Sequence, residues 1–323
     1  MKFSVVIPCY NAERWIEQTL TSVLAQTLPP HEVVIVNDGS TDQSQSRIES
    51  IMNTTSIPLV LVNTNRLGAG GARYAGIDAA SGDWLAFLDA DDWWDPNHLE
   101  RIQAAMVDSK DIMYLAAAKH FSINVNRVVS ISDSPFQDLE KHIDHHRYFQ
   151  LLQTHGLLEI SAMAMQRQHL VTVGKPERHL PCNGDLELTL RSLHGQTLTY
   201  DPVPSSYYRC NNADSLSRQF TRSADKLTSY FKLLLDLKDL YAIPESVFRQ
   251  QAQTLASKSM HFNAQGRQEI LQLVWPYLSQ SNQLVFRAAS LFPPAYLWLN
   301  TVRNKLRGPQ YAPRQVVTQG NLN

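Results

Sequence analysis

The chain has 323 residues, of which 43% are hydrophobic and 18% are charged, an ordinary mixture for a globular protein that buries a core. Its formal net charge of −1 gives no overall electrostatic attraction to nucleic acid, so we do not expect that class of partner. Cys9, Cys182 and Cys210 are too few and too scattered for a disulfide framework or a zinc site, which predicts reduced thiols in a cytoplasmic protein. The first residues have neither the pattern of a signal peptide nor that of a membrane span.

The first ninety residues alternate between apolar strands and amphipathic helices. Strands are predicted at 3–8, 32–36, 59–62 and 84–88, and helices at 12–26, 42–52 and 70–80. We expect Ser40 or Thr41 to cap the second helix, and Asp95 to cap a further helix with Pro96 at its first position. Near-continuous apolar strands separated by helices predict an α/β fold with a parallel sheet covered on both faces.

Polar and acidic residues follow three of these strands, at the edge of the sheet where such folds bind ligands. The three segments are Pro8-Cys9-Tyr10-Asn11, Asn37-Asp38-Gly39 and Asp89-Ala90-Asp91-Asp92. Three carboxylates this close repel one another, so the last segment requires a cation, a set of hydrogen-bond donors or a solvated turn.

The order of the sequence blocks adds a family resemblance, which covers roughly the first 220 residues. The chain resembles glycosyltransferase family 2 in "VVIPCYNAERW", "VVIVNDGSTD", "NRLGAGGARYAGIDAASGDWLAFLDADD", "SAMAMQRQHLVTVG", "NGDLELTLR" and "YYRCNNADSLSR". The resemblance implies the GT-A fold, a Rossmann-like, mostly parallel sheet flanked by helices, over residues 1–220. It also implies an inverting enzyme that moves one sugar from a nucleoside-diphosphate sugar, most often a UDP-sugar, to an acceptor hydroxyl.

The resemblance assigns roles to the acids that follow the fourth strand. Asp91 would hold a divalent metal, and Asp89 would contact the ribose or assist with the metal. Such a metal stabilises the negative charge that develops on the leaving diphosphate, and Mn²⁺ or Mg²⁺ suits oxygen ligands of this kind. The alternative is a solvated acidic turn.

The same resemblance implies a nucleotide-sugar site at the ends of the other strands. Asp38 would bind the base and Arg73 would lie against the nucleotide, with Pro8, Tyr10 and Asn11 beside them. Asp38 could instead belong to an ordinary turn before a helix, and Arg73 could project from an exposed helix. Relatives usually have asparagine after the arginine, where this chain has Tyr74.

In the second half of the chain, the resemblance implies that Asp185 is the general base, which takes the proton of the attacking acceptor hydroxyl. Relatives usually have glutamate before this aspartate, and this chain has Gly184. Asp185 could also be a simple helix cap. Glu187 is expected on a different helix face and to tolerate replacement by Gln. Many relatives also have a histidine in the loop where this chain has Asn211 and Asn212, so Arg209 and Arg218 could neutralise the diphosphate instead.

Residues 221–323 predict a helical extension that packs against the catalytic domain or against a second subunit in a homodimer. Leu227, Phe231, Leu234 and Leu237 recur at helical spacing. From residue 282 onward there is no acidic residue, and the apolar stretch 291–299 is too short to span a bilayer. For residues 283–323 we therefore expect either peripheral contact with the inner face of the membrane or a helix buried against the catalytic domain, followed by a disordered tail after residue 307.

Two other functions compete with glycosyl transfer to a glycan or a lipid-linked acceptor. A sugar nucleotidyltransferase would have a glycine-rich loop directly after the first strand, where this chain has Pro8-Cys9-Tyr10-Asn11. A non-catalytic nucleotide-sugar-binding module would be consistent with Gly184 and the missing histidine. Transfer of a single sugar is favoured over polymer synthesis because the chain lacks the Gln-x-x-Arg-Trp motif and the membrane helices of the processive synthases in this family.

Overall fold

The computed structural model describes residues 1–122, 126–131, 139–155, 159–175, 184–210, 224–239, 243, 245–291, 293 and 296. The chain divides into two compact units, residues 1–212 and 213–323. The boundary expected at residue 220 lies outside the described residues, as do Asn211, Asn212, Arg218, Cys182 and the tail after residue 307.

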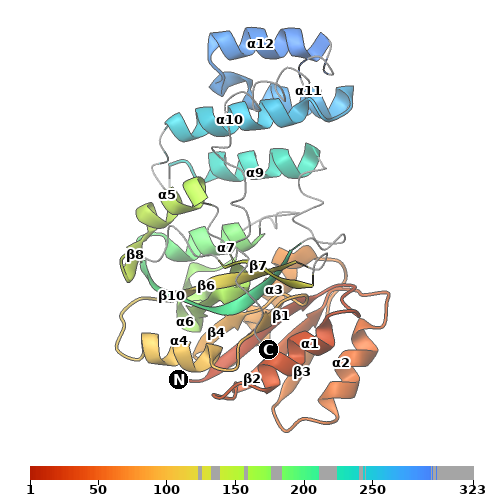
Figure 1. Ribbon diagram of the computed structural model, residues 1–323, viewed down its shortest axis with the longest axis vertical. Helices are drawn as coiled ribbons and strands as arrows, with labels where there is room; N and C mark the ends of the chain where they lie inside the picture. Colours follow the sequence, from red (N-terminus) through yellow and green to blue (C-terminus); the bar gives the residue numbers. More distant parts are fainter. Residues whose placement is uncertain are drawn as a thin grey trace. The chain divides into compact units, whose positions relative to one another are not determined.

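The first unit contains one sheet with helices on both faces (Figure 1). Its strands are β1 Phe3–Cys9, β2 Glu32–Asn37, β3 Leu59–Asn63, β4 Trp84–Phe87, β5 Trp93–Trp94, β6 Met113–Ser122, β7 Arg127–Ile131, β8 His142–Asp144, β9 Met163–Gln166 and β10 Thr197–Cys210. Its helices are α1 Ile16–Leu24, α2 Ser44–Met52, α3 Gly68–Ala79, α4 His98–Met106, α5 His145–His155, the 3-10 helix η1 Ile160–Ala162, α6 Arg167–Val173 and α7 Gly184–Leu193.

The sheet has the strand order β3-β2-β1-β4-β9-β6-β10-β5, with β7 paired to β6 and β8 paired to β10. The four strands predicted in the first ninety residues pair in parallel, as expected. The later strands make the sheet mixed, because β9 runs antiparallel to both β4 and β6 while β10 runs parallel to β6. The carboxyl ends of β1, β2 and β4 therefore meet at one edge.

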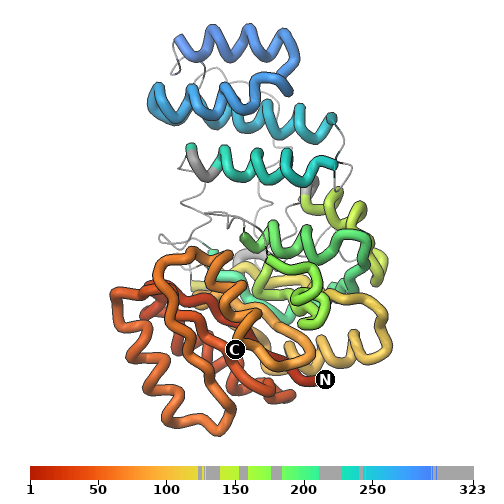
Figure 2. The backbone as a smooth tube through the Cα atoms, turned by 180° about the vertical axis from the view of Figure 1, so that it is seen from behind, coloured from red at the N-terminus to blue at the C-terminus, as the bar shows by residue number. Residues whose placement is uncertain are grey.

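The core lies between the central strands and the two helix layers. All six residues of β2 are buried, as a strand covered on both faces requires. Ile16, Leu20 and Val23 of α1 are buried at helical spacing. Figures 1 and 2 show α1, α2 and α4 on one face of the sheet and α3, α6 and α7 on the other.

Two predicted helix caps are wrong, because tertiary contacts use those side chains. Ser40 accepts a hydrogen bond from the Asn11 backbone N–H (3.1 Å), so it ties the loop after β2 to the loop after β1. Gln43 occupies the N-cap position of α2. The Asp95 carboxylate pairs with Lys119 Nζ at 2.6 Å, and Asn97 occupies the N-cap position of α4.

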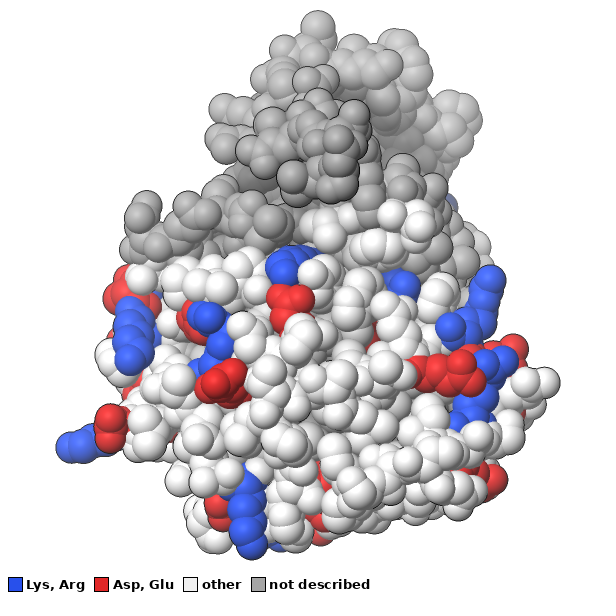
Figure 3. Space-filling model, turned by 60° about the horizontal axis from the view of Figure 1, so that its bottom comes forward, with Lys and Arg blue, Asp and Glu red and all other residues white. Residues whose placement is uncertain are grey.

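Basic and acidic side chains lie beside one another on the face that Figure 3 shows, without a patch of one sign among the described residues of that face. Ion pairs on the surface of this unit include Arg101 with Asp201 at 2.7 Å.

The second unit is helical, with α9 Ala224–Asp236, α10 Glu245–Ser259, α11 Ala264–Val274, the 3-10 helix η2 Trp275–Tyr277 and α12 Gln280–Leu291. The predicted apolar face of its first helix is confirmed, since Leu227, Phe231, Leu234 and Leu237 are buried. The rings of Phe231, Phe248 and Tyr277 pack with centroid distances of 5.4–6.1 Å. No helix among the described residues is long and apolar enough to cross a bilayer.

Candidate active site

The three aspartates after β4 occupy different environments. Asp92 is almost fully buried, and its carboxylate accepts hydrogen bonds from Ser161 Oγ (2.6 Å) and from the backbone N–H of Arg209 (2.8 Å). Burial, with the nearby charges of Asp91 and Asp89, raises the pKa of Asp92 well above its usual value. Asp89 and Asp91 are only half-buried. Asp92 is thus an anchor of the acidic loop, and its two neighbours are the carboxylates at the sheet edge.

Arg209 of β10 supports this acidic loop. Its guanidinium lies between the rings of Trp15 and Trp93, 4.2 and 4.5 Å from their centroids, and its Nε donates to the backbone carbonyl of Asp91 (2.7 Å). A second hydrogen bond runs from Nη2 to Gln18 Oε1 (2.7 Å). Burial lowers the pKa of Arg209, although the negative charges beside it act in the opposite direction. These contacts give Arg209 a structural role in the loop, which the sequence did not indicate.

Arg73 pairs with one of the predicted site carboxylates, Asp89, and lies within electrostatic reach of another, Asp185. Its Nη2 donates to Asp89 Oδ1 at 2.5 Å, and its side chain is only 5% exposed, so the exposed-helix interpretation is wrong. Burial alone would lower the pKa of Arg73, but the negative charges of Asp89 and Asp185 outweigh that effect and raise it. Its Nε is buried without a hydrogen-bond partner among the described residues. Strand β4, helix α3 and helix α7 therefore bring one cation and two carboxylates together.

Asp38 organises the loop that precedes α3. It is 4% exposed, and its Oδ1 accepts from Thr64 Oγ1 and from the Leu67 N–H, both at 2.7 Å. Its Oδ2 accepts from the Gly68 N–H at 2.7 Å, at the start of the helix. The side chain thus contacts the loop after β3 rather than its own turn. Its role toward a nucleotide base remains a prediction.

The loops after β1 and β2 form one connected rim. Asn11 has a left-handed backbone (φ 48°), and its Oδ1 accepts from the Thr41 N–H at 2.8 Å. Tyr10 is 43% exposed, and the Arg66 guanidinium lies 4.3 Å from the centroid of its ring and donates to its hydroxyl. Pro8, at the end of β1, is half-buried. The rim thus presents an exposed aromatic ring and a cation close to the Asp38 loop.

Helices α3 and α7 cross at two glycines. A Cβ atom on Gly184 would lie 2.5 Å from the Cα of Gly70, so no larger residue fits without a shift of one helix. Next to this crossing, Tyr74 donates to Glu187 Oε2 (2.9 Å), and Arg191 donates to Glu187 Oε1 (2.5 Å). The two positions that differ from the family pattern, 74 and 184, therefore belong to the same helix contact. Gly184 has a packing explanation, and Glu187 is buried in this contact.

Asp185 lies in the first turn of α7, half-buried, and its Oδ1 accepts from the Leu186 N–H at 2.9 Å. The glycine crossing places it within electrostatic reach of Arg73. This position is compatible both with a helix-terminal residue and with the predicted general base.

Three titratable residues beside the site were missed by sequence reasoning. His120 Nε2 lies 3.0 Å from Glu159 Oε1, and this interaction raises the pKa of His120. Burial, with the charges of Asp89 and Asp185, raises the pKa of Glu159 although His120 opposes the shift. Tyr148 of α5 is buried within electrostatic reach of Asp185 and Glu159. These three residues come from separate parts of the chain and share no motif, so their spacing in the sequence did not predict that they lie beside the site.

The carboxylates fit a divalent cation that is held mostly by its substrate. No group of three or more His, Cys, Asp or Glu among the described residues is arranged to hold a metal. Mg²⁺ and similar ions bind through one or two carboxylates, with phosphate oxygens and water as the other ligands. Asp91, and Asp89 beside Arg73, are the oxygen donors suited to that arrangement.

Comparisons with known proteins agree on one family. The model of "Glycosyl transferase family 2" matches residues 4–173. An uncharacterized glycosyltransferase of Haemophilus influenzae is 27% identical over 71% of this chain and 87% of its own length. A UDP-Glc:α-D-GlcNAc-diphosphoundecaprenol β-1,3-glucosyltransferase of Escherichia coli, WfgD, is 34% identical over 39% of this chain and 48% of its own length. This chain covers only 17% to 62% of the length of the first curated relatives that it matches.

Among solved structures, residues 1–349 of S. aureus TarS in complex with UDP-GlcNAc superpose with a TM-score of 0.54. The sequence identity is 20%, and the match covers 82% of this chain and 83% of TarS 1–349. The likeness shows the fold, and it confirms the expected α/β GT-A architecture with a helical region after it.

Proposed function

Because this chain belongs to glycosyl transferase family 2, we propose that it is an inverting, metal-dependent enzyme that moves one sugar from a UDP-sugar to a hydroxyl of a cell-surface glycan or lipid-linked acceptor. The observation that supports this proposal most directly is the ion pair of Arg73 with Asp89, which lies within electrostatic reach of Asp185. It joins the predicted donor side of the site, on β4, to the predicted acceptor side, on α7.

On the donor side, Asp91 and Asp89 would hold Mn²⁺ or Mg²⁺. When bound, the metal supplies positive charge that stabilises the leaving diphosphate. Asp38 and the rim formed by Pro8, Tyr10 and Asn11 would hold the nucleotide. The exposed ring of Tyr10 offers a flat surface to the base, and Arg66 lies over that ring.

On the acceptor side, Asp185 would take the proton of the attacking hydroxyl. Inversion requires the acceptor and its base to lie on the face of the sugar opposite the leaving diphosphate. Helix α7 carries Asp185, and the proposed metal carboxylates follow the end of β4. The proposed base and the proposed metal ligands therefore come from separate elements. Arg73 offsets the mutual repulsion of the carboxylates around it.

The donor is proposed from the relatives. WfgD is named for transfer from UDP-Glc, and TarS has been solved with UDP-GlcNAc. The acceptors in the two names are poly(ribitol-phosphate) for TarS and a diphosphoundecaprenol-linked GlcNAc for WfgD. A UDP-hexose or UDP-N-acetylhexosamine is therefore the proposed donor.

Thermal-shift measurements with UDP-Glc, UDP-GlcNAc and UDP, each with and without Mn²⁺, test the donor side. A ligand at a hundredfold excess over its dissociation constant stabilises the native state by about 2.7 kcal/mol. We expect a metal-dependent rise in melting temperature for at least one of these ligands. The same melting temperature with every nucleotide, with and without Mn²⁺, would contradict the proposal.

A further inference from the structure

The two units carry opposite charge. Residues 213–323 contain thirteen Lys and Arg residues but only six Asp and Glu residues, a formal charge of +7. Residues 1–212 contain sixteen basic and twenty-four acidic residues, a formal charge of −8. The net charge of −1 for the whole chain hides this asymmetry. A unit with a strong positive charge attracts anionic partners and raises their local concentration.

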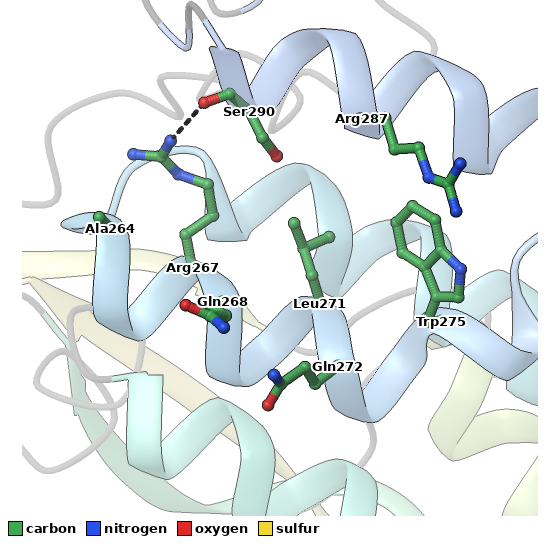
Figure 4. A pocket seen from close by; sticks show the side chains of 8 residues that line it. All are labelled: Ala264, Arg267, Gln268, Leu271, Gln272, Trp275, Arg287 and Ser290. Atoms are coloured by element: carbon green, nitrogen blue, oxygen red, sulfur yellow. Dashed lines mark hydrogen bonds between the residues drawn. The ribbon is translucent and has the colours of Figure 1, made fainter.

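A cavity of about 720 Å³ lies within the second unit, between α11 and α12 (Figure 4). Its lining residues are Ala264, Arg267, Gln268, Leu271, Gln272, Trp275, Arg287 and Ser290, with two arginines and no carboxylate among them. Its volume is in the range of small-molecule binding sites. Figure 4 shows Arg267 toward one end of the groove, and Trp275 with Arg287 toward the other.

Arg267 is held in place by two hydrogen bonds, whereas Arg287 is exposed and contacts a tryptophan ring. Arg267 donates from Nη1 to the Ser290 carbonyl (3.0 Å) and from Nη2 to the Phe262 carbonyl (3.2 Å). Each of these nitrogens has a second hydrogen, which leaves the guanidinium able to donate to a further acceptor. Arg287 lies 5.3 Å from the centroid of the Trp275 ring, a cation–π contact. The held Arg267 side chain loses little entropy when it binds a ligand, so its end of the groove is preorganised for an anion.

The other lining groups suit a saccharide. Trp275 and Leu271 provide apolar surface for the face of a sugar ring, and Gln268 and Gln272 provide amide donors and acceptors for hydroxyl groups. The groove itself is concave and lined by amide side chains, unlike the protruding apolar surface by which a helix enters a membrane.

We propose that this groove is a non-catalytic binding site for an anionic saccharide, in which one carboxylate or phosphate pairs with Arg267, a second pairs with Arg287 at the other end of the groove, and a sugar ring lies on Trp275. The inference rests on the proposed function in one respect, because it assigns the acceptor of that reaction to the anionic glycans. The groove would retain the acceptor polymer on the enzyme through a contact separate from the reacting hydroxyl.

Affinity electrophoresis of the full-length protein in native gels tests the proposal without reference to catalysis. The gels contain polygalacturonate, an anionic polysaccharide, or dextran, a neutral one. We expect polygalacturonate to retard the wild type and dextran to leave its mobility unchanged. Arg287→Ala and Trp275→Ala should each raise the apparent dissociation constant about tenfold, the loss expected for a charge-assisted contact.

Arg249→Ala provides the matched control, because Arg249 is an exposed arginine of α10 outside the groove. It removes the same charge and should keep wild-type retardation. Equal retardation of the wild type and the Arg287→Ala and Trp275→Ala variants would overturn the proposal. A loss in Arg249→Ala as large as in Arg287→Ala would also overturn it, since the attraction would then follow charge alone.

A second measurement separates this inference from the proposed function. Phosphatidylglycerol vesicles that bind the wild type but not Arg287→Ala would identify a lipid site and overturn the saccharide assignment. Hydrolysis of the UDP-sugar donor without acceptor should be equal in the wild type and the groove variants. A wild type that is retarded by polygalacturonate but shows no metal-dependent donor binding or hydrolysis would contradict the proposed function while it supports the groove.

Discussion

Gly184 of α7 packs directly on Gly70 of α3, so closely that a Cβ atom on Gly184 would lie 2.5 Å from the Cα of Gly70. This crossing positions Asp185, the next residue, relative to Arg73, which is one turn further along α3. Gly184, which departs from the family pattern, thus permits the close helix contact on which the positions of Asp185 and Arg73 depend. The packing of Gly184 explains this residue without a loss of catalytic function.

Gly184→Ala should reduce both stability and turnover. The added methyl group meets backbone rather than a flexible side chain, so α7 must move, and such overpacking costs about 1–3 kcal/mol. We expect a fall in melting temperature of several degrees and a drop in kcat, since Asp185 moves with the helix. Gly70→Ala provides a comparison, because its Cβ would meet Gly184 at the less severe distance of 3.1 Å. A larger effect of Gly70→Ala than of Gly184→Ala would contradict the packing argument.

Asp91 and Asp92, although adjacent, should differ in what substitution removes: nucleotide binding at Asp91 and stability at Asp92. Asp91→Asn should abolish metal-dependent nucleotide binding with a change in stability within about 0.5 kcal/mol, because the side chain lies at the sheet edge. Asp92→Ala should cost about 1–3 kcal/mol, since the Ser161 hydroxyl and the Arg209 N–H lose their buried acceptor. Chemical denaturation and titration with UDP and Mn²⁺ measure the two effects. Wild-type affinity for UDP and Mn²⁺ in Asp91→Asn would remove Asp91 from the metal site.

The sequence predicted those parts of the molecule that depend on local pattern. The strands around Val6 and Ala86 are apolar throughout, so their parallel pairing, and the gathering of Asp38 and Asp89 at one edge, could be inferred. The support of the acidic loop could not, because Arg209 reaches Trp15 from a distant part of the sequence. Asp95 shows the same limit. Local sequence chemistry favours it as a helix cap, but its carboxylate pairs with a lysine of β6 instead.

His120 should make stability depend on pH above its usual titration range. Its folded-state pKa is raised above the ordinary value of 6.5 by Glu159, so its stabilising contribution is full below pH 6.5 and is lost as the pH rises through the folded-state pKa. The raised pKa of Glu159 acts in the same direction, because the folded state then binds the proton more tightly. We expect the melting temperature of the wild type to fall relative to that of His120→Gln as the pH rises from 6.5 through the raised folded-state pKa of His120. If the melting temperatures of the two proteins change with pH in parallel, the His120–Glu159 pair does not contribute to the pH dependence of stability.

The predicted membrane contact can be assigned to one face of α12. Leu284 and Leu291 are 67% and 86% exposed, and seven residues apart they lie on the same side of the helix. If this face enters the interface of anionic vesicles, Leu284→Gln with Leu291→Gln should reduce co-sedimentation at least several-fold. Val107→Gln, at an exposed apolar residue of the first unit, is the control and should sediment as the wild type does. Equal sedimentation of all three proteins would end the membrane prediction for this helix.

Asp185→Asn tests the proposed chemistry most directly. A general base acts on the acceptor hydroxyl and adds little to donor affinity, so transfer should fall about a hundredfold or more while the UDP-sugar binds normally. Glu187→Gln, for which the sequence predicted a much smaller loss, is unsuitable as a control, because Glu187 is buried and bonded to Tyr74 and Arg191. Asp78→Asn replaces it, since Asp78 is an exposed aspartate of α3 that pairs with Lys175. Full turnover in Asp185→Asn with an acceptor that the wild type glycosylates would place the base elsewhere, and Glu159, within electrostatic reach of Asp185, would be the next residue to replace.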